Sequence, residues 1–213
     1  MVEQKDTVVI VGCGGVGSNL AYLLSKEKSI KKMILIDGDK VERKNLERQF
    51  FTEGDIEEPK VLALKNSLNQ FSPELNIIAV NEFVKEKEDI SLYFEGQSYN
   101  NCFLFACTDN ASSKKMIAKI TDINTMFIGC EENITELRTT FKSTTWSRGD
   151  GYDSTQDFEG NLIGVFFAYI QFKLMSAQKL SMFCNQDINK GKLVDTILEN
   201  SLQPTYDDDG DSR

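Results

Sequence analysis

A glycine-rich turn between a buried strand and a helix is the strongest constraint in this sequence. Residues 7–11 (TVVIV) form a β-branched run that predicts a buried strand. The turn GCGGVG follows at residues 12–17, and apolar residues then recur at helical spacing to about residue 27. A second apolar run at residues 33–36 predicts another buried strand. Strand, turn, helix and strand within about 30 residues predict a βαβ unit.

Strand-like and helix-like runs continue to alternate beyond this unit. Further strands are predicted at residues 75–80, 102–106 and 125–129. Helices are predicted from Pro59 to Phe71 and at residues 111–120, and residues 82–94 fit either a charged helix or a loop. This alternation predicts a Rossmann-like, doubly wound α/β fold, with a mostly parallel sheet and helices on both faces.

The second half of the chain departs from this alternation. Residues 134–141 are strand-like and extend the predicted sheet with mixed or antiparallel strands. Residues 142–160 are polar and predict a long crossover loop, and residues 161–183 predict a long helix that is apolar on most of its surface. We expect one domain over residues 1–185, followed by a polar C-terminal extension over residues 186–213 with a disordered acidic tail.

The composition of the 213-residue chain excludes several kinds of chemistry. It contains no histidine, which removes every Ser-His-Asp or Cys-His nucleophile pair and every histidine metal site. The five cysteines form no C-x-x-C pair, so a Cys₄ zinc site is not expected. An odd, scattered set of cysteines without a signal peptide indicates a reducing compartment, and we expect a cytoplasmic protein.

Hydropathy and charge argue against two kinds of partner. The longest apolar run, at residues 162–170, is about half of the roughly 20 residues that a membrane-spanning helix needs. The net charge is −9, and negative charge is repelled by the phosphate backbone of nucleic acids. We therefore expect neither a membrane nor a nucleic acid as partner.

The glycine turn and the acid after the second strand predict a nucleotide site. Glycines between a strand and a helix allow a tight turn and close approach of the backbone to a phosphate. The helix N-terminus adds free N–H groups and the positive end of its dipole. Asp37 ends the second predicted strand, where a carboxylate can accept hydrogen bonds from a ribose. Up to this point an NAD enzyme fits as well as an ATP enzyme.

The residues that follow favour a triphosphate. Asn45, Arg48 and Lys60 can supply amide and cationic donors spread over several ångströms, which a triphosphate needs. Asp109 follows the fourth predicted strand, at the edge of the sheet where ligands bind, and it offers the oxygen ligand that magnesium prefers. An NAD site explains the glycine turn and Asp37 but not this set.

Four motifs together resemble the ThiF/MoeB/HesA superfamily, the bacterial relatives of ubiquitin-activating enzymes. They are the GCGGVG turn (12–17), the loop DGDKVERKNLERQ (37–49), the Pro59-Lys60 pair that opens a helix and the CTDN turn (107–110). The Leu-Ile-Gly triplet at residues 162–164 also resembles the family, so the match covers about residues 7–183.

This resemblance implies an activity. Members use ATP and Mg²⁺ to adenylate the C-terminal carboxylate of a ubiquitin-like or sulfur-carrier-like protein or a peptide, and pyrophosphate leaves. It also implies roles for the matched residues. Asp37 would hold the ribose, Asn45, Arg48 and Lys60 would bind phosphates, and Asp109 would organise Mg²⁺ and the attacking carboxylate. The remaining implied nucleotide-binding residues are Gly12, Gly14, Gly15, Gly17, Asp39 and Gln49. The implied catalytic residues are Arg48, Lys60 and Asp109.

The chain departs from the family in three ways. Both C-x-x-C pairs that bind structural zinc in many members are absent, so zinc is not expected. Residues 142–160 contain no cysteine, so we expect no thioester step within this chain. The family often inserts a partner subunit's arginine into the site. Here Arg43, Arg138 and Arg148 are the remaining candidates, and each is expected to be a solvated surface charge. Cys13, inside the glycine turn, predicts that thiol reagents block nucleotide binding.

Two functional hypotheses follow. The first is a minimal ATP-dependent adenylating enzyme. The alternative is a catalytically reduced, ThiF-like binding subunit of a larger complex, which the missing transfer cysteine favours. The apolar residues of the late helix exceed what one buried face needs, so a homodimer is expected.

Overall fold

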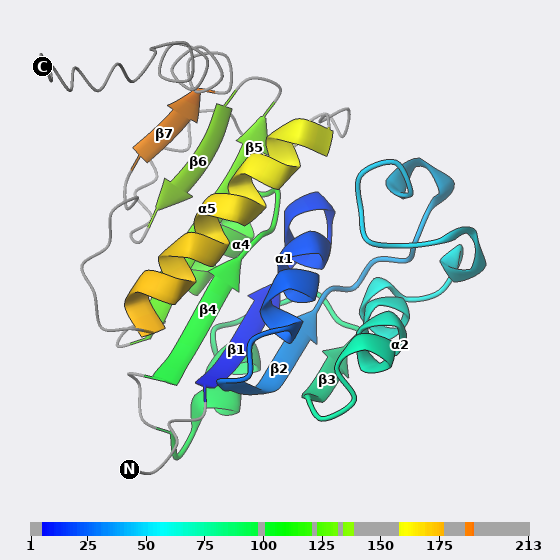
Figure 1. The fold of residues 1–213 in the computed structure, drawn as a ribbon. Helices are drawn as coiled ribbons and strands as arrows, with labels where there is room; N and C mark the ends of the chain where they lie inside the picture. Colours follow the sequence, from blue (N-terminus) through cyan, green and yellow to red (C-terminus); the bar gives the residue numbers. More distant parts are fainter. Residues whose placement is uncertain are drawn as a thin grey trace, which may run out of the picture.

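A seven-stranded sheet organises the residues that the computed structural model describes, which are 6–97, 101–120, 123–131, 134–138, 158–176 and 186–189. The strand order is β3-β2-β1-β4-β5-β6-β7 (Figure 1). The strands are β1 (Asp6–Val11), β2 (Ile30–Ile36), β3 (Asn76–Val80), β4 (Cys102–Ala106), β5 (Asn124–Glu131), β6 (Ile134–Arg138) and β7 (Gln186–Asn189).

The pairing of these strands confirms the predicted α/β fold. The five strands from β3 to β5 are parallel, and β6 and β7 extend the sheet as antiparallel strands. The chain winds outward from β1 to β3 and then returns to the other side of β1 as β4. This reversal creates a switch point at the carboxyl ends of β1 and β4, which is where open α/β sheets bind their ligands.

Helices cover both faces of the sheet, as the alternation predicted. One face carries α1 (Gly15–Ser25), α2 (Lys60–Phe71) and α5 (Phe158–Ser176), which lie in front of the sheet in Figure 1. The other face carries α3 (Glu88–Ser91) and α4 (Ala111–Ile117). Successive side chains of a strand point to opposite faces, so alternate residues of β1 pack into two separate apolar clusters.

Several element boundaries differ from those predicted. Helix α5 begins at Phe158, so residues 158–160 are helical rather than part of the crossover loop, because the apolar spacing starts there. Helix α4 ends at Ile117, although Ile120 still packs on the core. Phe71 of α2 is 50% exposed instead of buried, and its ring packs against Tyr22 and Phe50 at the surface. The predicted loop at residues 142–157 and the helix beyond residue 176 lie outside the described residues.

Strand β7 is the element that the sequence did not predict. It pairs with β6 over four residues and belongs to the same sheet as β1. It therefore lies within the stretch that the sequence predicts as a C-terminal extension. A four-residue polar strand has too few side chains to show alternation, which explains why its sequence gave no periodic signal.

The described helices were also compared with the requirements of a membrane span. Within the ranges given above, no helix is both long enough and apolar enough to cross a bilayer.

Two glycines allow α1 to lie against the turn that precedes it. A Cβ atom on Gly17 would lie 1.8 Å from the carbonyl oxygen of Gly12. Gly12 has φ +89, and a Cβ there would lie 2.9 Å from the carbonyl carbon of Cys107 and the nitrogen of Thr108. The contacts are with backbone atoms, which cannot move aside as a flexible side chain can. The glycines therefore fix how closely α1 approaches β1 and β4.

Gly17→Ala is expected to destabilise the protein by about 2 kcal/mol or more, because the new methyl group overlaps the Gly12 carbonyl. Urea unfolding followed by circular dichroism measures the change in free energy of unfolding. Gly54→Ala is the matched control, since its Cβ would have only the Thr52 hydroxyl near it, at 3.8 Å. Equal stability of the two variants would show that the close approach at Gly17 has no energetic importance.

Candidate active site

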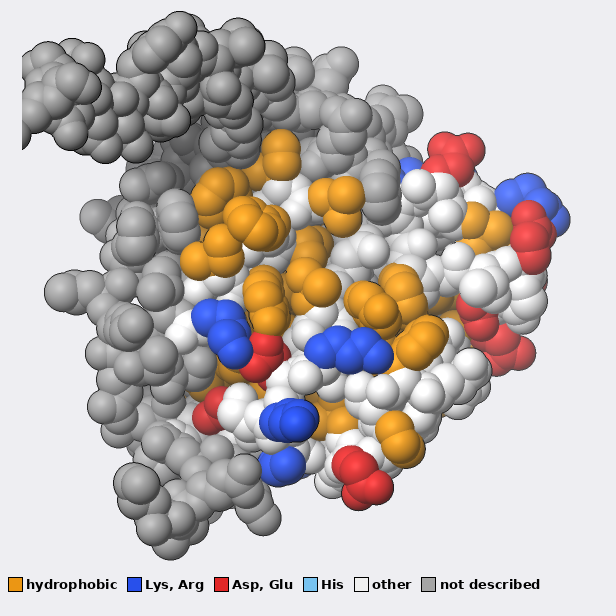
Figure 2. All heavy atoms as spheres, in the orientation of Figure 1, with side chains coloured by type: hydrophobic (Ala, Val, Ile, Leu, Met, Phe, Trp, Pro, Cys, Tyr) orange, Lys and Arg blue, Asp and Glu red, His pale blue; other side chains and the backbone are white. Residues whose placement is uncertain are grey.

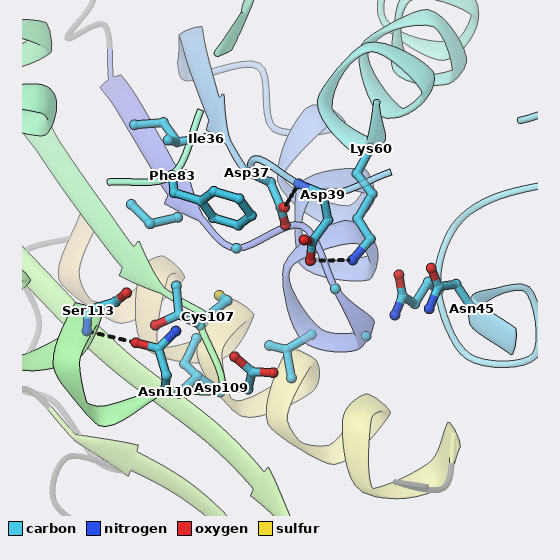
Figure 3. Close-up of a pocket in the computed structure, with 18 of the residues that line it drawn as sticks. Ile36, Asp37, Asp39, Asn45, Lys60, Phe83, Cys107, Asp109, Asn110 and Ser113 are labelled. Atoms are coloured by element: carbon cyan, nitrogen blue, oxygen red, sulfur yellow. Dashed lines mark hydrogen bonds and ion pairs between the residues drawn. The ribbon is translucent and has the colours of Figure 1, made fainter. Parts of the chain in front are cut away.

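A cavity of about 290 Å³ opens at the switch point of the sheet. It lies at the carboxyl ends of β1, β2 and β4 and is bounded by the glycine turn and the loop that follows β2 (Figure 3). Ten predicted site residues line it: Gly12, Gly14, Gly15, Asp37, Asp39, Asn45, Arg48, Gln49, Lys60 and Asp109. The fold therefore brings together residues that are up to 97 positions apart in the sequence, from Gly12 to Asp109.

Gly17 is the predicted site residue that does not line the cavity. It lies in the first turn of α1 and is buried against the Gly12 carbonyl. Its lack of a side chain serves the packing of the helix on the turn. The glycine motif thus divides into residues that face the cavity and one that sets the position of α1.

The N-terminus of α1 is open toward the cavity. Gly14 occupies the capping position, and no side chain caps the helix. Gly14 and Gly15 both line the cavity, and the first turn holds no acidic residue. The first N–H groups of a helix lack partners within it, so this end offers donors and a positive dipole to an anion.

Asp37 links the end of β2 to the glycine turn. One carboxylate oxygen accepts a hydrogen bond from the Cys13 N–H at 2.6 Å, and the other accepts one from the Asp39 N–H at 2.8 Å. Burial raises the pKa of this carboxyl, and the nearby Lys60 charge and the two backbone donors partly offset that effect. Each carboxylate oxygen keeps a lone pair for a further donor, such as a ribose hydroxyl.

Lys60 reaches the same corner of the cavity from the first residue of α2. Residues 39–41 pair with residues 57–60: the Val41 N–H donates to Glu58, the Glu57 N–H to Val41 and the Lys60 N–H to Asp39. This pairing holds the Lys60 ammonium 3.1 Å from an Asp39 carboxylate oxygen (Figure 3). Lys60 is only 7% exposed, so its charge acts in a partly desolvated setting.

The loop between β2 and α2 is fixed mostly by its own polar side chains. Asn45 is buried and accepts a hydrogen bond from the Glu42 N–H at 2.9 Å. Its amide nitrogen is left as the donor that this side chain can offer a phosphate. From α1, Asn19 donates to the Arg48 carbonyl at 3.0 Å, and Ser18 accepts from the Phe50 N–H at 3.0 Å. The loop and the helix N-terminus are therefore held in one arrangement.

Asp109 approaches the cavity from the opposite side, in the turn between β4 and α4. It is exposed, and the neighbouring Asn110 caps α4 by accepting a hydrogen bond from the Ser113 N–H at 2.8 Å. The fully buried Lys114 donates from its ammonium group to the Ile128 carbonyl at 2.9 Å and thereby ties α4 to β5. These contacts hold the turn that carries Asp109, and the sequence analysis did not identify Lys114.

Other lining residues were also missed by the sequence analysis. They come from the segment after β3, the ends of β1, β2 and β5 and the turn after β4: Val11, Val16, Ile36, Glu42, Lys44, Glu82, Phe83, Val84, Cys107, Thr108, Asn110, Ser113, Ile128 and Gly129. A signal was present for several of them, because the carboxyl ends of parallel strands meet at one edge of the sheet. Phe83 and its neighbours lie in a stretch without periodicity, so nothing in the sequence placed them there.

Two buried oxygen atoms in the cavity wall lack a hydrogen-bond partner among the described residues: the Gln49 side-chain oxygen and the Thr108 hydroxyl. Buried polar groups normally have partners, so such atoms indicate a polar ligand. The charged lining consists of three basic side chains, Lys44, Arg48 and Lys60, and five acidic ones, Asp37, Asp39, Glu42, Glu82 and Asp109. A polyphosphate would add further negative charge, so the donor set fits a nucleotide that arrives with a divalent cation.

Two candidate arginines have different environments. Arg43 is exposed and pairs with Glu53 at 2.7 Å, as predicted for a surface charge. Arg138 is 7% exposed, so the prediction of a solvated surface charge is wrong for it, because it lies on β6 within the sheet. Arg148 lies outside the described residues.

Cys13 is fully buried inside the glycine turn. Burial raises the pKa of its thiol well above the ordinary value, and the Asp37 charge raises it further. Only the thiolate attacks alkylating reagents, so this thiol is both shielded and protonated. The structure therefore argues against the expectation that thiol reagents reach Cys13 and block the site.

Iodoacetamide at pH 7.5 is expected to alkylate Cys13 at least about tenfold more slowly in the folded protein than in urea. Mass spectrometry of the peptide that carries Cys13 follows the reaction over time. The unfolded protein is the control for intrinsic reactivity. Equal rates in the two states would contradict the buried, protonated thiol.

Comparisons with known proteins agree with this geometry. A relative is the ubiquitin-like modifier-activating enzyme 5 of Aedes aegypti, which is 33% identical over 125 residues that cover 54% of this chain and 30% of the relative. The solved structure of PaaA aligns with a TM-score of 0.68 and 17% identity, over 88% of this chain and 64% of PaaA. Escherichia coli MccB with AMPCPP and MccA aligns with a TM-score of 0.69 and 19% identity, over 87% of this chain and 60% of MccB.

These matches differ in what they establish. At identities below 25%, the solved structures show the shared fold alone. The chain spans about a third of the length of the curated relative and about three fifths of the two solved chains. Residues 3–134, well over half of the chain, match the ThiF family. The chain therefore belongs to the ThiF family.

Proposed function

We propose that this chain is an ATP-dependent adenylating enzyme that acts on a C-terminal carboxylate. The observation that carries the proposal is the two-sided cavity, with Asp37 and three basic side chains on one side and Asp109 on the other. Family membership supports an adenylating activity of the ubiquitin-activating type in general. The substrate proposed is a ubiquitin-like or sulfur-carrier-like protein or a peptide, in line with the names of the relative and of MccB with MccA.

The proposed reaction transfers AMP to the carboxylate. One carboxylate oxygen attacks the α-phosphorus of ATP, the bond from that phosphorus to the bridging oxygen breaks, and pyrophosphate leaves with the electron pair. The product is a mixed anhydride of the carboxylate and AMP. The protein needs no covalent group for this step, since positioning and charge neutralisation supply the catalysis.

The described residues divide these tasks. Asp37 accepts hydrogen bonds from the ribose, and the open N-terminus of α1 lies under the phosphates. Arg48 and Lys60 neutralise the phosphate charge, and Asn45 and Gln49 contribute amide groups at the loop. Asp109 stands across the cavity, where the attacking carboxylate and the metal are needed. A buried cation such as Lys60 interacts more strongly with phosphate than an exposed one.

Magnesium is part of the proposal, and Asp109 would hold it together with the phosphates. The ion supplies charge neutralisation at the phosphate oxygens. Within the described residues, no three His, Cys, Asp or Glu side chains cluster closely enough to hold a metal by themselves. Magnesium commonly binds through one or two carboxylates and substrate phosphates, and this donor set matches that pattern.

The alternative of a catalytically reduced binding subunit has no specific observation in its favour. The cavity keeps the nucleotide-binding set that such a subunit would not need. The cytoplasmic location and the division at residue 185 stay predictions.

A homodimer is also proposed, with α5 at the contact. Leu162 and Phe166 are 40% and 55% exposed, one helical turn apart. Figure 2 shows hydrophobic side chains gathered on the outward face over α5. The other face of the helix packs on β5, β6 and α1 through buried residues such as Phe172. Exposed apolar patches of this kind commonly mark interaction sites.

Lys60→Met is expected to weaken MgATP binding by roughly 10- to 150-fold, because a charge-assisted contact contributes about 1.5–3 kcal/mol. Titration calorimetry measures the Kd, and pyrophosphate exchange with a candidate carboxylate substrate measures adenylation. Methionine keeps the buried stem of the side chain, so folding is preserved.

Lys40→Met is the matched control. Lys40 lies in the same loop but outside the cavity lining, and its exposed ammonium is 3.9 Å from Glu57. It is expected to leave binding unchanged. If the wild type binds no MgATP, or if Lys60→Met binds it as tightly as the wild type, the proposed function is wrong.

Phe166→Glu is expected to shift the protein from dimer to monomer, because a carboxylate cannot be buried in an apolar contact without a large cost. Sedimentation velocity at micromolar concentration measures the oligomeric state. Leu92→Glu is the control, since Leu92 is similarly exposed but follows α3 on the opposite face of the sheet. A wild type that sediments as a monomer would remove the homodimer.

A further inference from the structure

Phe83 occupies an unusual position for an aromatic side chain. It is 62% exposed, the highest value among the large hydrophobic residues of the described chain that are exposed. It is also the one residue of that set that lines the cavity. An exposed aromatic ring in the wall of a binding cavity has no role in the core, so its apolar surface is available to a ligand.

The ring is held against the backbone next to Asp37. A Cβ atom on Gly38 would lie 2.7–2.8 Å from three carbons of the Phe83 ring. Only glycine therefore lets the ring rest against this point of the chain. Figure 3 shows the Phe83 ring close to Asp37, on the side of the cavity away from Asn45 and Lys60. The aromatic surface thus lies beside the carboxylate and away from the cationic end.

The neighbours of this ring are apolar. Ile36, Val11 and Val84 line the same cavity, and Ile36 is the last residue of β2, directly before Asp37. A nucleotide held at its ribose by Asp37 has its phosphates on one side of the sugar and its base on the other. With the phosphates at Arg48 and Lys60, the base falls on the side of Phe83.

We propose that Phe83, held in place by Gly38, is the base-binding residue of this site and packs against the purine ring of ATP. This inference rests on the proposed function, since it assigns the base end of the same nucleotide. Contact between an aromatic side chain and a base depends on the π-face and not on a hydrogen-bonding pattern. Phe83 therefore contributes affinity for a nucleotide over a bare polyphosphate.

The test compares two ligands, MgATP and magnesium tripolyphosphate, by titration calorimetry. Phe83→Ala is expected to weaken MgATP binding about tenfold, the usual effect of removing one aromatic contact with a base, and to leave tripolyphosphate binding unchanged. Phe83→Tyr keeps the ring and is expected to bind MgATP as the wild type does. Phe71→Ala, which removes a half-exposed ring outside the cavity lining, is the matched control.

Gly38→Ala separates a contact role from a general structural one. The added methyl group displaces the Phe83 ring, so MgATP binding is expected to weaken as in Phe83→Ala. In the double variant the second substitution is expected to add nothing, because Gly38 acts through Phe83. Thermal unfolding of each variant checks that it is folded.

The outcomes distinguish two failures. If the wild type binds neither ligand, the proposed function fails and this inference fails with it. If the wild type binds MgATP but Phe83→Ala binds it equally well, the base assignment alone is wrong. The assignment is also wrong if Phe83→Ala weakens both ligands alike, because the ring would then act on the phosphate end or on folding.

Discussion

The contact between Gly17 and the Gly12 carbonyl determines where everything else in the site lies. With no Cβ in the way, α1 begins directly above the carboxyl end of β1 and its first N–H groups face the switch point. Asp37 then binds the Cys13 N–H in the same turn, which joins the end of β2 to the end of β1. A larger residue at either glycine would move the helix away from the sheet, and the cavity would lose its floor.

Electrostatics at this point of the sheet depends on a few buried groups and little on the net charge of −9. Burial raises the pKa of the Asp37 carboxyl, and the nearly buried Lys60 ammonium offsets part of that cost. Lys60 also pairs with Asp39 at 3.1 Å. Partly desolvated charges interact more strongly than solvated ones, so these groups dominate the local field. An acidic protein can therefore bind an anionic ligand at one end of a cavity.

Much of this arrangement could be predicted from the sequence. Strong periodic signals placed β1, α1, β2 and β4, and motif spacing identified ten of the residues that line the cavity. The rest had no local signal. Strand β7 is too short to show alternation, Phe83 lies in an aperiodic stretch, and Lys114 becomes important only through a contact with Ile128 that is 14 residues away. Contacts made by tertiary packing are not encoded in the spacing of one segment.

The three parts of the cavity constrain the chemistry when they are considered together. An apolar end at Phe83 and Ile36 suits a base, Asp37 suits a ribose, and the basic loop suits phosphates. A nucleotide bound in that order extends from Phe83 toward Lys60, and Asp109 lies on the opposite wall of the cavity. A hydride-transfer site needs a second dinucleotide half and a place for nicotinamide, neither of which this set of residues addresses. A carboxylate brought to Asp109 with Mg²⁺ between the two anions has the α-phosphate within reach, and that arrangement favours adenylation over simple nucleotide binding.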